Sequence, residues 1–421
     1  MAFWDRFRKI PNVQIVETSG DYNPYEITSI GNLVVPEKLT DSNVFSLCNS
    51  VAEMDFPVDF YADRVSKLRK FIVDSKGNEV ENTELNRFLT NINPFYSFSD
   101  LVYQYVYSLL SYGNALNYLS APKSYKNLTV NSISRWDVLN PDLTTIEEFN
   151  NVSILDLSDK KQLIKRAKYS EYSGKEKVLT IDNLFIDNYS LRKQTNSAIL
   201  SKSPLFSRNK SIDILLAVYS ARYNVYANNG AAGYLAKKSL QANNGALESI
   251  FDNVNHREKI LEDINNRNGL TGRKNLWGIS GVPIEFVKTL ATISELLPLD
   301  EVLENAIKIA SAFQIPPVLV PRNDQSTYDN QADSERSVWE NGILSLDKTV
   351  NENLAKLFGF DKVGYAIKSD YSTVSCLITN AGKKEDIITK RLNNLKSIKE
   401  LDPNADITSE VNKIIEQYGS K

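Results

Sequence analysis

A long apolar stripe toward the C-terminal end constrains the fold of this chain most strongly. Between about Val338 and Phe358 the apolar side chains recur at steps of three and four residues: Trp339, Ile343, Leu346, Val350, Leu354 and Leu357. This spacing places them on one face of an α-helix. Such a helix is a rod of roughly 30 Å whose apolar face must pack against another apolar surface. The rest of the sequence therefore has to supply that surface.

The first half of the chain combines a helix with short strands. Ser97 and Asp100 form a variant of the capping box, so a helix should begin there, and Gly113 supplies a left-handed stop. A strand is expected at 114–119, and residues 122–200 alternate between strand-like and turn-like sequence. The pattern predicts an α+β fold.

Long helices dominate after residue 204. Apolar periodicity predicts helices at about 211–228 and 246–268, and a third that begins near Pro298 and is ended by Pro316 and Pro317. The polar face of this third helix carries Glu301, Glu304, Lys308 and Ser311. Two interpretations stay open: a solvated face with an i, i+4 Glu–Lys pair, or the lining of a channel.

Shorter elements fill the gaps between these helices. Two strands, around 274–279 and 284–289, are separated by a Gly-Val-Pro turn and are predicted to pair. The segment from Pro321 to Ser334 has almost no apolar residue and is predicted to be a loop. Two short helices are expected at 385–399 and 409–418.

Composition narrows the class of protein. The 421 residues include 49 Lys and Arg against 52 Asp and Glu, so strong static binding of nucleic acid by the whole surface is not expected. No apolar run approaches the roughly 18 residues needed to span a bilayer, so we expect a soluble protein with no membrane partner. Cys48 and Cys376 lie far apart, and we expect two buried thiols in a reducing cytoplasm.

The chemistry-bearing residues argue against an enzyme. His256 is the only histidine, so no His-pair metal site can form, and no phosphate-binding glycine loop is present. On a helix, Asp55, Asp59 and Asp63 would share one face, as a nuclease metal site requires. Pro57 is expected to interrupt that helix, so a solvated acidic face is the favoured interpretation. We therefore predict no catalytic residue, no cofactor and no metal.

A set of motifs in a fixed order resembles the shorter, siphophage-type portal proteins of tailed bacteriophages. In that family a helix ends in Phe-Gly-Ile/Val-Pro, and a Thr-Tyr-Ser-Asn-like loop and a long helix follow. The corresponding segments here are Ile307–Leu319, Ser326–Asn330 and Asn351–Leu354. Weaker matches lie upstream in the right order: Glu84–Pro94, Tyr112–Ala115 and Ser203–Leu205.

Two positions depart from the family pattern. Gln314 stands where the family usually has glycine, and Asp329 stands where it usually has serine. The part of the chain after Asn380 also lacks the family's common Asn-Glu-x-Arg ending.

The resemblance implies a portal-like α+β fold, built as a dodecameric ring around an axial channel. The implied regions are an N-terminal arm at 1–24, an α/β wing at 25–243, stem helices at 246–268 and 296–314, a β clip at 269–291, a channel loop at 318–336, a long wing or tunnel helix at 337–360, and a C-terminal wing strand and crown at 361–421.

The resemblance also implies sites and partners. Double-stranded DNA would pass through the channel without sequence preference, and the other partners would be the major capsid protein, the terminase large subunit and the tail connector. The protein would be assembled in the host cytoplasm and would reside at the capsid portal vertex of the virion. The implied DNA-channel residues are Arg322, Asn323, Asp324, Gln325, Tyr328, Asp329 and Asn330; the stem channel face is Glu301, Glu304, Lys308 and Ser311; the clip residues are Arg273, Lys274 and Trp277.

Two alternatives remain beside the portal interpretation. One is another structural virion component, such as a connector or a capsid-associated protein, which ring stoichiometry and an axial hole would separate from a portal. The other is a metal-dependent nuclease that uses Asp55, Asp59 and Asp63, for which DNA cleavage by the purified protein would be the sign.

Overall fold

The protein is described here by a computed structural model that covers residues 37–80, 82–122, 130–149, 157–170, 174–189, 197, 199–227, 233–237, 284–288, 298–321 and 328–377. These residues belong to two compact units, which we treat separately. Of the described residues, the larger unit contains those within 40–207 and 309–377, and the smaller unit contains those within 37–39 and 208–308. The predicted helices at 246–268, 385–399 and 409–418 lie outside the described residues.

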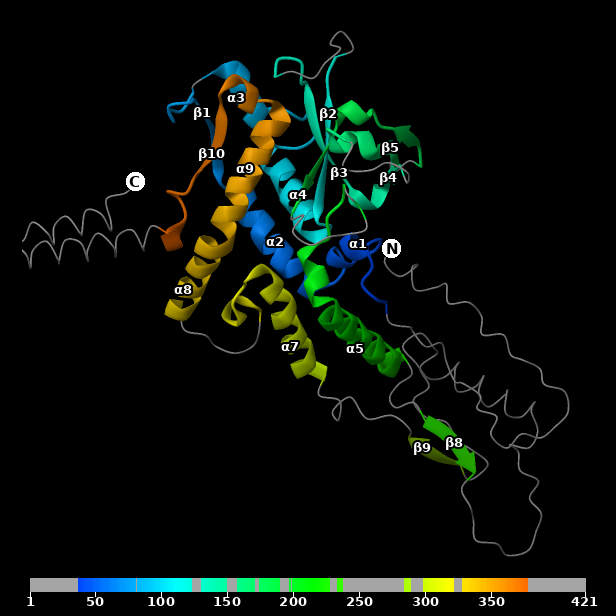
Figure 1. The fold of residues 1–421 in the computed structure, drawn as a ribbon. Helices are drawn as coiled ribbons and strands as arrows, with labels where there is room; N and C mark the ends of the chain where they lie inside the picture. The colour runs from blue at the N-terminus through cyan, green and yellow to red at the C-terminus, as the bar shows by residue number, and fades with distance from the viewer. Residues whose placement is uncertain are drawn as a thin grey trace, which may run out of the picture. The chain divides into compact units, whose positions relative to one another are not determined.

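Helices α2 (Ala52–Ser66) and α4 (Phe98–Ser111) pack against each other in the larger unit (Figure 1). The predicted capping box of α4 is present, since Ser97 accepts from the Asp100 amide and Asp100 accepts from the Ser97 amide. The helix is followed by Gly113 at φ +91°, which confirms the left-handed stop. Two shorter helices, α1 (Val44–Cys48) and α3 (Thr83–Thr90), complete the N-terminal part of this unit.

The expected interruption at Pro57 was wrong, because α2 runs through it without a break. A proline in a helix interior loses one hydrogen bond and costs about 3 kcal/mol. Met54, Val58, Ala62 and Val65 on the same helix are all fully buried. Burial of each large apolar side chain contributes roughly 1.5–3 kcal/mol, so packing outweighs the local penalty.

Three small antiparallel sheets complete the larger unit and confirm the α+β class. The first places β2 (Asn114–Ser120) between β3 (Arg135–Leu139) and β7 (Leu184–Asn188), with Leu119 opposite Trp136. The second places β5 (Ile164–Ser170) between β4 (Thr144–Glu148) and β6 (Glu176–Val178). The third pairs β1 (Arg69–Val73) with β10 (Ala366–Asp370), so it joins the two ends of the unit's sequence.

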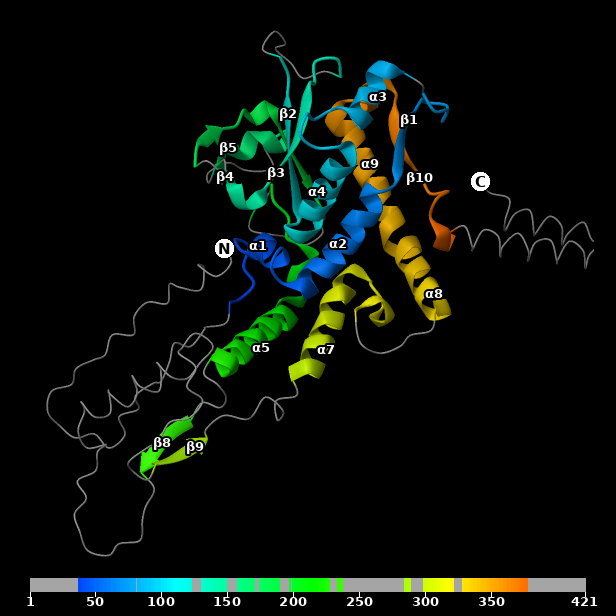
Figure 2. The ribbon, with the colours of Figure 1, turned by 180° about the vertical axis from the view of Figure 1, so that it is seen from behind.

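The long C-terminal helix exists, but it is longer and less regular than predicted (Figures 1 and 2). It consists of α8 (Tyr328–Val338), one π-helical turn (Trp339–Ile343) and α9 (Leu344–Phe358), and it stops at Gly359 with φ +76°. Every member of the apolar stripe is buried except Leu346, which is half-buried: Trp339, Ile343, Val350, Leu354 and Leu357.

Residues 328–336 had been predicted as loop, and α8 corrects that prediction. The segment has hardly any apolar residue, so a search for apolar periodicity cannot find it. Charged pairs stabilise this helix instead: Arg336 contacts Asp333 at 3.3 Å, and Arg64 of α2 contacts Glu335 at 2.9 Å. Pairs three or four residues apart support a polar helix by a few tenths of a kcal/mol each.

An aromatic cluster attaches α9 to the rest of the core. The ring of Phe358 lies 5.1 Å from that of Phe88 in α3 and 5.5 Å from that of Trp136 in β3, measured between centroids. Phe360 contacts both Phe88 and Phe358, and all of these side chains are buried. This cluster is the apolar surface that the helical stripe required.

Two of the motifs behind the portal resemblance dock on each other although about ninety positions separate them. Ser201 donates to the Gly113 carbonyl at 2.6 Å, and Asn114 exchanges two hydrogen bonds with the Ser201 backbone at 2.7 and 2.8 Å. Ser203 donates to the Leu110 carbonyl at 2.7 Å. A Cβ on Gly113 would lie only 2.5 Å from the Lys202 carbonyl carbon, so this contact requires glycine.

A buried ion pair joins α9 to the β1–β10 sheet. The Lys70 ammonium donates to Asp347, Asn351 and Ser369, and the Lys70 and Asp347 side chains are 1% and 0% exposed. Tyr371 and Asn351 donate to the second Asp347 oxygen at 2.7 and 3.1 Å. Burial lowers the pKa of Lys70, and the adjacent Asp347 carboxylate opposes that shift.

The smaller unit contains α5 (Asn209–Ala227), close to the predicted 211–228, and the first part of α7 (Pro298–Ala310). Arg208 donates to the Lys308 carbonyl at 3.1 Å, which connects the start of α5 to α7. Strand β9 (Ile284–Lys288) forms as predicted, but its described partner is β8 (Gly233–Lys237). The expected partner, 274–279, lies outside the described residues. No helix in the described parts of the chain is long and apolar enough to cross a membrane.

Candidate functional site

The predicted DNA-channel residues fall into two groups. Arg322, Asn323, Asp324 and Gln325 lie outside the described residues, as do the predicted clip residues Arg273, Lys274 and Trp277. Tyr328, Asp329 and Asn330 form the first turn of α8, and Asn330 is exposed. The structure therefore describes both flanks of the segment 322–327: α7 with residues 311–321 on one side, and the long helix that begins at Tyr328 and includes the π-helical turn on the other.

The residues of the predicted stem channel face are exposed. Glu301, Glu304, Lys308 and Ser311 are all exposed, and Glu304 and Lys308 form an i, i+4 ion pair at 2.6 Å. An exposed pair of this kind contributes only a few tenths of a kcal/mol. Both interpretations of this face, solvated or channel-lining, agree with its exposure.

Helix α7 does not continue to Pro316 as predicted, because Gln314 ends it first. A 3-10 turn, Ser311–Phe313, leads to Gln314 at φ 59° and ψ 25°. The Gln314 amide donates to the Ser311 carbonyl at 3.2 Å and the Ile315 amide to the Ala310 carbonyl at 3.3 Å, which is the Schellman arrangement. Gln314 is the one non-glycine residue with positive φ in the described part of the chain.

The left-handed backbone at position 314 explains why related proteins usually have glycine there. The cost of glutamine at this position can be measured. Replacement of Gln314 by glycine should raise the free energy of unfolding by about 1 kcal/mol, because glycine adopts the left-handed conformation without the Cβ clash. Urea denaturation of both proteins measures the difference. Gln314→Ala, which keeps the Cβ, is the matched control and should give no gain. Equal stability of all three proteins would contradict this account.

Tyr61 of α2 contacts both flanks of the segment 322–327. Its buried hydroxyl donates to the Phe313 carbonyl at 2.6 Å, and its ring lies 6.1 Å from the Phe313 ring. Burial raises the pKa of Tyr61, so the hydroxyl stays protonated and remains a donor. On the other flank, a Cβ on Gly342 in the π-helical turn would lie 2.1 Å from the Tyr61 hydroxyl oxygen. Tyr61, Phe313 and Gly342 therefore form one tight junction, which we call the flank junction.

Arg64, one helical turn along α2, adds a polar contact to α8. It donates to Glu335 through two guanidinium nitrogens, at 2.9 and 3.3 Å, and its guanidinium lies 3.4 Å from the Phe60 ring centroid. One face of α2 thus contacts the long helix at two places. Arg64 binds Glu335 in α8, before the π-helical turn, and Tyr61 packs against Gly342 within that turn.

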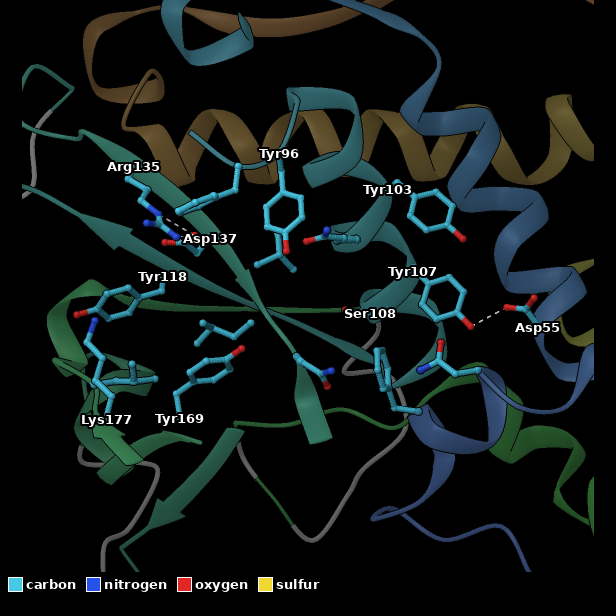
Figure 3. A pocket seen from close by; sticks show the side chains of 18 residues that line it. Asp55, Tyr96, Tyr103, Tyr107, Ser108, Tyr118, Arg135, Asp137, Tyr169 and Lys177 are labelled. Atoms are coloured by element: carbon cyan, nitrogen blue, oxygen red, sulfur yellow. Dashed lines mark hydrogen bonds and ion pairs between the residues drawn. The ribbon is translucent and has the colours of Figure 1, made fainter. Parts of the chain in front are cut away.

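A cleft of about 810 Å³ opens between α1, α4 and the sheets of the larger unit. Figure 3 shows its aromatic lining, which includes Tyr96, Tyr103, Tyr107, Tyr118 and Tyr169. Two pairs of polar groups face each other in it: Tyr107 donates to Asp55 at 2.7 Å and Arg135 pairs with Asp137 at 2.6 Å, while the Lys177 ammonium lies 5.5 Å from the Tyr118 ring centroid. The two carboxylates of the cleft are therefore engaged by neighbouring side chains.

The three aspartates of the nuclease alternative do lie on one face of α2, but each has a separate partner. Asp55 accepts from Tyr107 and Asp59 from Tyr103, both at 2.7 Å, while Asp63 pairs with Lys67 at 2.7 Å. Among the described residues, no group of His, Cys, Asp and Glu side chains is placed to hold a metal ion. The geometry supports an α2–α4 contact at Asp55 and Asp59 and a local i, i+4 ion pair at Asp63.

Comparison with known proteins agrees with this fold. The phage portal protein family matches residues 57–381, which is most of the chain, whereas no curated protein matches the sequence significantly. The structure is similar to a chain in the neck of an empty gene transfer agent particle computed with C6 symmetry, with TM-score 0.55 and 16% identity over 86% of this chain and 92% of that one.

Two further solved structures are similar at the same level. A chain of the virion of a native gene transfer agent particle gives TM-score 0.54 and 15% identity, covering 85% of this chain and 92% of that one. A chain in the neck of the native particle computed with C12 symmetry gives TM-score 0.52 and 16% identity, covering 83% of this chain and 88% of that one. At these identities the likeness concerns the fold.

The fold and the family match together define a structural virion protein of the α+β portal type. The chain belongs to the phage portal protein family, and its role is that of a structural portal.

Sequence reasoning missed the flank junction. Tyr61 and Gly342 carry no motif, and their contact depends on the π-helical turn that brings Gly342 against α2. The one available signal was Gly342 itself, a glycine within an otherwise helical pattern, which costs helix stability and often has a packing reason.

Proposed function

We propose that this protein assembles head to tail into a closed ring, of twelve subunits, that forms the DNA channel at one vertex of a tailed-phage capsid. The family match over residues 57–381 carries the proposal. The C12 symmetry of the similar neck structure supports the subunit number. Heterologous interfaces close into a ring when their rotation divides a full turn.

Within this ring the parts take separate tasks. The wing at 25–243 forms the body, the stem at 246–268 and 296–314 surrounds the channel, and the clip at 269–291 faces the terminase during packaging and the tail connector afterwards. The C-terminal part, 361–421, contributes a wing strand and the crown. The major capsid protein surrounds the wing.

DNA contact is assigned to the segment between α7 and α8 and to the exposed stem face. Arg322 is the only basic residue between Pro321 and Ser334, beside Asp324, Asp329 and Asp333. The stem face carries both signs of charge in Glu301, Glu304 and Lys308. Weak, sequence-independent contact follows, since tight phosphate binding would oppose the sliding of DNA.

The protein itself has no catalytic task in this proposal. Packaging ATP hydrolysis belongs to the terminase, while Asp55 and Asp59 join α2 to α4 and Asp63 pairs with Lys67. Metal-dependent DNA cleavage or ATP hydrolysis by purified protein, lost on their joint replacement by Asn, would contradict this assignment. Negative-stain images that show no axial hole would instead favour another virion component.

The channel assignment has a direct test. Replacement of residues 322–327 by six Gly and Ser residues leaves α7 and α8 intact, so rings of unchanged mass should form. We expect these rings to package or retain much less DNA in complemented particles, because their channel contacts are altered. Light scattering measures ring mass and DNA content per particle measures filling.

The control is the same kind of replacement at residues 171–173, between β5 and β6 on the wing, which should leave filling unchanged. Normal filling with the 322–327 replacement would remove the channel role from this segment.

A further inference from the structure

The flank junction ties together three parts of the larger unit that are far apart in sequence. Tyr61 is 5% exposed, and its hydroxyl is the donor that satisfies the Phe313 carbonyl. Gln314 directly after Phe313 turns the chain into its left-handed conformation, and Pro316 continues it in extended form at φ −62° and ψ 148°. The hydroxyl therefore holds the backbone at the point where the chain leaves α7.

The same hydroxyl also sets how closely the long helix that begins at Tyr328 can pack against α2. Gly342 lies in the π-helical turn, and any side chain there would collide with Tyr61. A π turn holds one more residue than an α turn, and each residue of an α-helix corresponds to about 100° of rotation. The turn therefore sets the rotation of α8 relative to α9, and its contact with Tyr61 fixes that rotation against α2.

We propose that Tyr61 is a positioning residue for DNA passage: it fixes the two flanks of the segment 322–327 relative to each other, by binding the end of α7 and seating the π-helical turn. The proposal rests on the proposed portal function. Arg64 supports the same arrangement through Glu335 in α8.

The Tyr61 hydroxyl can be removed without disturbing the fold of the subunit. Tyr61→Phe keeps the ring and its packing but removes the donor to the Phe313 carbonyl, which is then buried without that partner. The apolar core of α9 at Phe358, Phe88 and Trp136 contains no part of the flank junction. Subunits should therefore fold and assemble, and the direct contact of α8 with the turn Pro317–Leu319 should remain, while Phe313 loses the hydrogen bond that holds it against α2.

The experiment compares Tyr61→Phe with Tyr107→Phe in otherwise complete rings. Tyr107 is a matched control, since its hydroxyl also donates one hydrogen bond, which runs to Asp55 across the α2–α4 contact and away from the flanks. Both variants should form rings of normal mass with slightly lower melting temperatures. We expect a several-fold loss of retained DNA and faster hydrogen exchange in peptides of residues 328–338 for Tyr61→Phe alone. Equal DNA retention by the two variants would overturn the proposal.

A second pair of variants tests the contact with Gly342. Gly342→Ala should lower ring yield and DNA retention, because its Cβ meets the Tyr61 hydroxyl. Tyr61→Phe combined with Gly342→Ala should recover part of the ring yield, since the oxygen at 2.1 Å is gone and the ring carbons at 3.0 and 3.1 Å need to move by only a few tenths of an ångström. No recovery would mean that Gly342 is needed for another reason, and the seating role of Tyr61 would be lost.

The 322–327 replacement described above tells the two proposals apart. Normal filling by that replacement would remove the channel role of the segment itself. A filling defect in the replacement together with normal filling by Tyr61→Phe would overturn only the positioning role.

Discussion

Replacement of Lys70 by methionine is expected to lower the free energy of unfolding by about 3–5 kcal/mol, because it leaves the Asp347 carboxylate buried without its counter-charge. The Asp347 side chain is fully buried, and its remaining donors, Tyr371 and Asn351, are neutral. Neutral hydrogen bonds do not replace an ammonium in a low-dielectric interior. Urea denaturation of the purified subunit measures the change.

Two control variants test whether the buried Asp347 charge causes the loss of stability. Lys67→Met removes the exposed pair with Asp63, whose side chains are 71% and 36% exposed, and should change stability by less than about 0.5 kcal/mol. Lys70→Met combined with Asp347→Leu should recover much of the lost stability, since no uncompensated charge remains. If the double variant is as unstable as Lys70→Met alone, the buried charge is not the cause.

Gly113→Ala is expected to be among the most damaging single substitutions in the chain, costing about 4 kcal/mol or more. Gly113 combines two demands: φ +91° and a close approach to the backbone of Lys202 and Ser203, whose atoms would lie 2.5 Å from an added Cβ. Backbone atoms cannot move aside as a side chain can. The hydrogen bonds that Ser201 makes to Gly113 and Asn114 would be displaced with them.

The matched control is Gly77→Ala. Gly77 has nearly the same φ of +87°, but the nearest atom to its added Cβ is the Lys368 Nζ at 3.9 Å. It should cost only about 1–2 kcal/mol, the strain of the left-handed conformation. Urea midpoints and the soluble fraction on expression compare the two. Equal losses would show that strain alone, and not the contact with Lys202, explains the glycine at position 113.

The contacts of Gly113 and of the Lys70–Asp347 pair also explain why certain sequence motifs recur in portal proteins. The Gly-Asn-Ala and Ser-Pro-Leu segments form one docking site through Gly113, Asn114 and Ser201. Asn351, at the head of the last motif, completes the Lys70–Asp347 network. These motifs thus contribute buried contacts to the larger unit, which explains why they recur as a set.

Local features were predictable from the sequence. The capping box at Ser97, the stop at Gly113, α5 and the buried face of α9 depend on neighbouring residues or on a 3.6-residue period. Hydrogen bonds and apolar stripes of this kind can be recognised within a few helical turns.

The tertiary structure alone decided the features that join distant positions. Burial of its apolar face keeps α2 helical at Pro57. Ion pairs with Arg64 and Arg336 stabilise the polar helix α8, and β9 pairs with β8. The Lys70–Asp347 pair and the contact of Tyr61 with Phe313 and Gly342 join residues more than 250 positions apart. Their energies come from burial and from exclusion of water, which no single stretch of chain contains, so only the folded arrangement specifies them.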